Sequence, residues 1–161
     1  MSRSRPRCGG AALPAREAIG VTGTEVDSAE WSFPAAPGSV RSARHAVGDT
    51  LRHWGIEAAS GDLAVLLVSE LVTNSLRYAS GPIGVRLLRP CPDGDRGTGA
   101  DRRGLVVEVS DPVPDPPTER MAGPDDERGR GLQLVARSAH RWGTRRGKTG
   151  KAVWFELALP G

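Results

Sequence analysis

A glutamate and an asparagine stand out in the largely apolar stretch at residues 61–79, GDLAVLLVSELVTNSLRYA. Glu70 and Asn74 are four positions apart, so on a helix they lie one turn apart on the same side. Glu70 falls among leucines, where burying a carboxylate without a partner would be costly. Either both polar groups face a polar cleft, or a local hydrogen-bond network satisfies them. A Glu–Asn pair at an ordinary helix surface fits the spacing equally well.

Two further positions have residue types suited to ligand binding. Asp111 follows a predicted strand and precedes an irregular loop, where its carboxylate could accept a hydrogen bond from an exocyclic amine; equally, it could cap the Asp-Pro turn. Gly129-x-Gly131 opens a predicted helix, and glycines there let backbone amides approach a phosphate. Alone, such a G-x-G is usually a loop entry. The longer dinucleotide fingerprint and the G-x-x-x-x-G-K-[ST] loop are both absent from the sequence.

The central helix that would position Glu70 and Asn74 is predicted from apolar residues at helical spacing. These are Leu63, Leu66, Leu67, Leu71 and Tyr78. Ser60 is the predicted N-cap, and Ser80-Gly81-Pro82 ends the helix.

A second amphipathic helix is predicted from Ser39 to Gly55, and a third follows Gly129-Arg130-Gly131. The apolar face of the second comprises Val40, Ala43, Val47, Leu51 and Trp54, and that of the third comprises Leu132, Val135, Ala136 and Ala139. The predicted strands are an edge strand at 30–33, a hairpin of 83–88 with 105–110, a short strand opened by Trp142 and a closing strand at 152–157, with a turn at 145–150.

The order of these elements predicts an α+β fold, a two-layer sandwich with helices packed on one face of a mainly antiparallel sheet. Residues 111–128 contain five prolines, cannot form a regular element and are predicted to be a lid. Residues 1–29 lack periodicity and are predicted to be a disordered N-terminal tail, which leaves 30–161 as the folded domain.

Composition excludes several other classes of protein. Of the 22 Lys and Arg residues only Lys148 and Lys151 are lysines, so 20 are arginines. They are scattered among acids rather than gathered with aromatic residues, which argues against direct nucleic-acid binding. The two cysteines and three histidines have no metal-ligand spacing. No apolar run is long enough to span a membrane and no secretory signal is present, so a cytoplasmic location is expected.

Taken together and in this order, the signals resemble the GHKL-type (Bergerat) ATP-binding fold of histidine-kinase-type ATPase domains. ELVTNSLRYA is similar to the N-box of this family, DERGRGLQLV to its glycine box, and GKTGKAVWFEL to its terminal strand and preceding turn. The resemblance extends from about Trp31 to Leu159. Within the fold, the chain is most similar to the stand-alone anti-sigma factor/serine-protein kinase group of bacteria.

The resemblance implies a role for each candidate residue. Asn74 would coordinate Mg²⁺ through its amide oxygen, and Glu70 would act as the catalytic base or orient the attacking hydroxyl. Asp111 would read the adenine amino group. Backbone amides at Gly129, Gly131 and Leu132 would hold the phosphates of ATP, with Arg128 or Arg130 as charge partners. The protein partners would be a sigma factor, its small antagonist, or both, and a homodimer is plausible for such a protein.

One departure from the family pattern leaves two functions open. The family usually has Asp-x-Gly-x-Gly after the adenine-reading residue, whereas this chain has Asp111-Pro112-Val113-Pro114-Asp115-Pro116-Pro117. Proline removes the flexibility that glycine provides. The chain is therefore either an ATP-dependent serine kinase that regulates transcription through a sigma factor, or a module of the same fold that acts by partner sequestration with little phosphoryl transfer.

Overall fold

The computed structural model describes residues 26–78, 81–90, 104–112, 128–147 and 150–160. They form one sheet in the strand order β1-β2-β3-β5-β4, and every neighbouring pair is antiparallel. The strands are β1 (Val26–Phe33), β2 (Ile83–Pro90), β3 (Gly104–Asp111), β4 (Arg141–Gly147) and β5 (Gly150–Ala158). The helices are α1 (Gly38–His53), α2 (Ala58–Tyr78) and α3 (Arg128–Ser138).

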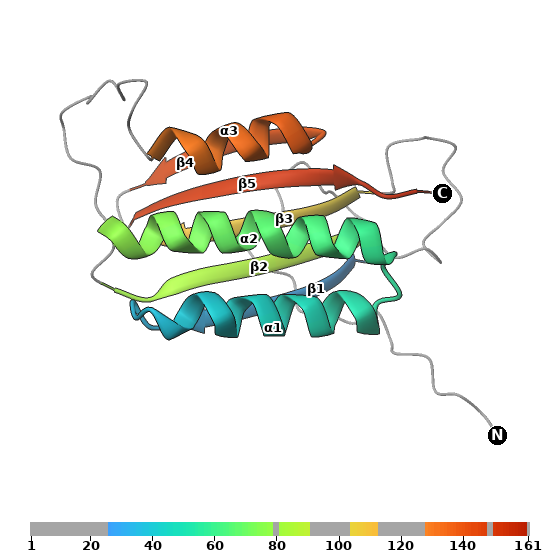
Figure 1. The fold of residues 1–161 in the computed structure, drawn as a ribbon, viewed down its shortest axis with the longest axis horizontal. Helices are drawn as coiled ribbons and strands as arrows, with labels where there is room; N and C mark the ends of the chain where they lie inside the picture. The colour runs from blue at the N-terminus through green and yellow to red at the C-terminus, as the bar shows by residue number, and fades with distance from the viewer. Residues whose placement is uncertain (1–25, 79–80, 91–103, 113–127, 148–149, 161) are drawn as a thin grey trace.

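The three helices cover one face of the sheet, with α2 between α1 and α3 (Figure 1). This arrangement confirms the predicted α+β class and its two-layer sandwich. The core lies between the layers, and α2 supplies more of it than the other helices, through Ala64, Leu67, Val68, Leu71 and Val72. Alternate residues of β3, namely Leu105, Val107 and Val109, belong to the same core. Burial of this aliphatic cluster is the main stabilising contribution to the fold.

Three boundaries differ from the sequence prediction. β1 begins at Val26, because residues 26–29 of the predicted tail pair with β2 from Pro90 to Leu87. α2 begins at Ala58, and the amide of Gly61 already donates to the carbonyl of Glu57 at 2.9 Å, so Ser60 lies inside the first turn and is not the N-cap. β4 continues to Gly147, because Arg145 and Arg146 pair with β5; the turn predicted at 145–150 was wrong for these residues.

Three residues predicted on apolar helix faces are exposed, and one of them is Tyr78, the last residue of α2, which is 39% exposed. Leu66 is 46% exposed, whereas its neighbour Leu67 is completely buried, because adjacent helix positions point about 100° apart. Ala136 is likewise exposed next to the fully buried Val135. The predicted apolar faces of α2 and α3 were therefore too wide.

The predicted lid falls mostly at 113–127, the hairpin connection at 91–103 and most of the N-terminal tail at 1–25, all outside the described residues. Within the described ranges, no helix combines the length and apolarity needed to cross a lipid bilayer.

Candidate functional site

Glu70 and Asn74 lie in the C-terminal half of α2, and both are half-buried. The neighbouring residues Leu67 and Leu71 are buried in the core, so the polar pair lies at the border between the core and the surface. Within the described part of the chain, neither side chain hydrogen-bonds to another residue. Among the described residues, no local network therefore satisfies these two half-buried polar groups.

Asn74 lies against the first turn of α3. A Cβ atom placed on Gly131 would be only 2.5 Å from Nδ2 of Asn74 and 3.7 Å from its Oδ1. Gly131 is buried, and α2 and α3 are in contact. Only glycine leaves room for the Asn74 amide here, so the structure brings together two residues that are 57 positions apart in sequence (131 − 74).

Asp111 is the last residue of β3 and is only 6% exposed. Its Oδ2 accepts a hydrogen bond of 3.2 Å from Oγ of Ser75, which is also buried and directly follows Asn74. Because a carboxylate offers two oxygens with several acceptor positions, this bond orients Asp111 without exhausting it. We call Asn74, Ser75, Asp111 and Gly131 the α2–β3–α3 cluster.

Ser75 was not predicted as part of the site. It lies four positions after Leu71 and seven after Val68, on the buried stripe of α2. A hydroxyl on a buried helix face requires a hydrogen-bond partner. The position of Ser75 on this face is therefore the sequence feature that could have identified it as part of the site.

The turn after Asp111 is enclosed by two glycines. Gly150 has φ +147°, and a Cβ there would lie 2.0 Å from the carbonyl oxygen of Asp111 and 2.9 Å from Cα of Pro112. A Cβ on Gly81 would lie 2.6 Å from Cγ of Pro112. This chain has Pro112 directly after Asp111, in the stretch where the family pattern usually has glycines. Glycines on two facing segments, Gly81 and Gly150, leave room for this proline. The sequence analysis did not identify either role.

A cavity of about 470 Å³ adjoins the Asp111–Pro112 turn. Its lining includes the basic residues Arg145, Arg146 and Lys151. Lys151 is paired with Asp111 across β3 and β5, and its Nζ lies 5.9 Å from the ring centroid of Tyr78 at the end of α2. Basic side chains therefore line the cavity beside the buried aspartate, and that of Arg145 forms an ion pair with Glu108.

The remaining predicted residues lie in the first turn of α3. The helix begins at Arg128, so Gly129 and Gly131 lie within this turn rather than before it. The first four amides of a helix have no partner within the helix and can hold an anion. The side chains of Arg128 and Arg130 are outside the described part of the structure. Leu132 packs against the hydrophobic core.

The donor chemistry of the site fits Mg²⁺ held largely by a ligand. Among the described residues, no group of three or more His, Cys, Asp or Glu side chains could hold a metal ion. Asn74 and Glu70 nevertheless offer hard oxygen donors one helical turn apart. Asn74 also lies beside the N-terminus of α3, where free backbone amides could bind phosphate. Mg²⁺ commonly keeps several waters and uses one or two protein ligands together with substrate phosphates.

Comparisons with known proteins agree with this geometry. The sequence model of one family, described as "Histidine kinase-like ATPase domain", matches residues 33–157. No curated protein matches the chain. Among solved structures, the chain is similar to the RsbU and RsbW domains of Rv1364c from Mycobacterium tuberculosis, with a TM-score of 0.61 and 14% sequence identity. The match covers 83% of this chain but only 32% of that one, and at this identity it supports the fold alone.

Proposed function

The chain belongs to the histidine kinase-like ATPase domain family, and on this basis we propose that it is an ATP-binding regulator that phosphorylates a serine of a small antagonist protein and sequesters a sigma factor. The observation that carries the proposal is the α2–β3–α3 cluster. Asn74 meets Gly131, and Ser75 donates to Asp111, so residues from three separate segments converge, and this convergence supports the proposal of an ATP site.

Each residue has a defined task in this proposal. Asp111, oriented by Ser75, accepts a hydrogen bond from the adenine amino group, and the first-turn amides of α3 hold the phosphates. Asn74 would hold Mg²⁺ through Oδ1, and the ion when bound would neutralise charge on the phosphates. Glu70 takes the proton of the serine hydroxyl. Phosphoryl transfer depends mainly on such positioning and charge neutralisation.

A second candidate function is partner sequestration with little or no phosphoryl transfer. The packing of Pro112 favours it, because this ring lies against the positions of Gly81 and Gly150 and stiffens the turn after Asp111. A stiff turn beside the proposed adenine position would weaken nucleotide binding.

Calorimetric titration with ATP and ADP in the presence of Mg²⁺ tests the site. We expect binding to the wild type and a loss of at least about tenfold in affinity for Asn74→Ala, which corresponds to about 1.4 kcal/mol. Thr73→Ala is the matched control, because the neighbouring Thr73 hydroxyl is satisfied within α2 by the Ser69 carbonyl at 2.7 Å. Equal affinities for wild type and Asn74→Ala would contradict the proposed site.

Glu70→Ala separates the two candidate functions. If the chain is a kinase, this variant retains ATP affinity but no longer transfers labelled γ-phosphate from ATP to a serine of the antagonist protein, since it lacks the base. Unchanged transfer would show that Glu70 is not the base. ATP binding by the wild type without transfer to any serine of the partner would favour sequestration.

A further inference from the structure

A groove of about 820 Å³ lies between α1 and α2. Four apolar side chains form part of its lining: Val40 and Leu51 of α1, Ile56 of the connection, and Val65 of α2. The groove also reaches Ala58, Gly61 and Asp62 in the first turns of α2. Asp62 and Asn74 are 12 residues apart on α2, or about 18 Å along the helix axis, so the groove is separate from the α2–β3–α3 cluster.

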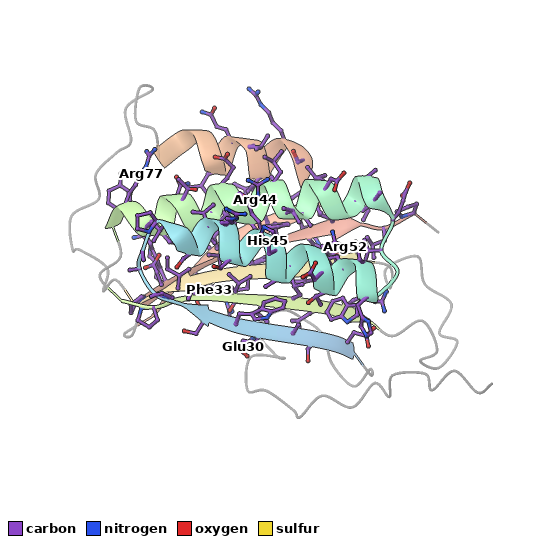
Figure 2. The ribbon with its side chains drawn as sticks, turned by 60° about the horizontal axis from the view of Figure 1, so that its bottom comes forward. Glu30, Phe33, Arg44, His45, Arg52 and Arg77 are labelled. Carbon is purple, nitrogen blue, oxygen red and sulfur yellow. The ribbon has the colours of Figure 1, made fainter. Side chains whose placement is uncertain are left out.

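The lining of the groove is strongly cationic on the α1 side. Its lining includes Arg41, Arg44, His45 and Arg52, and in the part of the chain that the structure describes Asp62 is the one acidic residue beside them. Arg52 forms an exposed ion pair with Asp49, but Arg41 and Arg44 form no ion pair with any described residue. Figure 2 shows Arg44, His45 and Arg52 following one another along α1. Among the described residues, Arg41 and Arg44 therefore have no acidic partner.

Gly48 keeps the middle of the groove open. It lies between Arg44 and Arg52 on α1, and a Cβ there would be 3.7 Å from Cγ2 of Val65 and 3.6 Å from the Arg52 guanidinium. Both are ordinary contact distances, so the Cβ atom of a larger residue would fit at this position. The side-chain atoms beyond that Cβ would then occupy the groove.

We propose that this groove docks an acidic amphipathic helix of a partner protein. Apolar side chains of such a helix would cover Val40, Ile56 and Val65, while its carboxylates would face Arg41 and Arg44. From Arg41 to Arg52 the basic residues span 11 positions, about 17 Å, which matches about three turns of a bound helix. Among the described residues that line the groove there is no Phe, Tyr or Trp on which nucleic-acid bases could stack. The proposal goes beyond the nucleotide site and does not require ATP binding.

Fluorescence anisotropy with two stapled helical peptides of about 18 residues tests the proposal. One peptide has leucine on one face and glutamate elsewhere, and the other has lysine in place of glutamate. We expect the wild type to bind the acidic peptide and not the basic one, with affinity falling as salt rises.

Arg44→Glu should weaken binding of the acidic peptide about tenfold or more, while its ATP affinity stays unchanged. Arg137→Glu is the control. It makes the same charge change at an exposed position of α3, which is separated from α1 by α2, and it should alter peptide binding less than about twofold. Gly48→Gln should also weaken peptide binding, without a change in charge, because its side chain occupies the groove.

Three results would overturn the proposal. They are equal binding of the acidic and basic peptides, equal losses in Arg44→Glu and Arg137→Glu, and tighter binding of a single-stranded oligonucleotide that Arg44→Glu abolishes. The last result would identify the groove as a nucleic-acid surface. If the wild type does not bind ATP, that result contradicts only the proposed function, because the peptide titrations are made without nucleotide.

Discussion

At Gly131, one added methyl group would lie 2.5 Å from the amide nitrogen of Asn74. That nitrogen is at the end of a flexible side chain, so Gly131→Ala would displace Asn74 rather than disrupt the backbone. We predict that ATP affinity falls about tenfold or more, because the amide oxygen is displaced from the position in which it is proposed to hold Mg²⁺. The free energy of unfolding should change little, since alanine favours a helix by about 1 kcal/mol over glycine and offsets the displacement. Calorimetry and urea denaturation measure the two quantities.

Gly61→Ala is the control for this prediction. Gly61 is in the first turn of α2, and a Cβ there would meet nothing within 4 Å. The substitution should leave ATP affinity unchanged and raise the free energy of unfolding by up to about 1 kcal/mol. If Gly131→Ala binds ATP as tightly as Gly61→Ala does, the close contact between Asn74 and Gly131 has no role in nucleotide binding.

Among the elements, α1 ends in a backbone arrangement that depends on one glycine. Gly55 has φ +72°, the amide of Ile56 donates to the Leu51 carbonyl at 2.9 Å, and the amide of Gly55 donates to the Arg52 carbonyl at 3.0 Å. These two bonds form a Schellman motif. It fixes the short connection to α2 and thereby sets how the two helices pack.

We predict that Gly55→Ala lowers the free energy of unfolding by about 1–2 kcal/mol, because alanine is disfavoured at this positive φ. Urea denaturation followed by circular dichroism measures the change. Gly38→Ala, at the first residue of the same helix, has nothing within 4 Å of the new Cβ and should change stability much less. Equal losses in both variants would mean that the cap contributes nothing specific.

Element types could be predicted from the sequence because they depend on local periodicity. Val40, Ala43, Val47 and Leu51 recur at helical spacing, and the structure confirms that they face inward. Boundaries depend instead on tertiary pairing. Val26 belongs to a strand because it pairs with Pro90, and Arg146 belongs to one because it pairs with Lys151. The spacing of neighbouring apolar residues in the sequence predicts neither pairing.

The candidate site shows the same division between local and tertiary information. Glu70, Asn74, Asp111 and Gly131 were identified through motif resemblance, because each stands in a short stretch with a recognisable order of residues. Their contacts could not be predicted in this way. The bond from Ser75 to Asp111 requires α2 to pack over β3, and the position of Gly150 beside Asp111 requires β3 to pair with β5.

Across the whole molecule, the helix layer places α2 between two distinct surfaces. The α2–β3–α3 cluster lies on the side of α3, and the cationic groove lies on the side of α1 (Figure 1). α1 and α2 each contribute several fully buried apolar residues to the core, including Ala43, Val47 and Leu67. The described part of α3 contributes one, Val135. The three helices therefore should not be equally stable against local opening.

We predict that amide hydrogens of α3 exchange with solvent faster than those of α1 and α2, because α3 has 11 residues, buries less and carries two glycines in its first turn. Addition of Mg²⁺ and ATP should slow exchange in α3 selectively, since the proposed phosphate contacts are made by its first-turn amides. Hydrogen exchange followed by mass spectrometry measures both effects. Asn74→Ala should retain the fast exchange and lose the response to nucleotide. If α3 is protected as strongly as α1 before nucleotide is added, local opening of α3 is not the step that nucleotide controls.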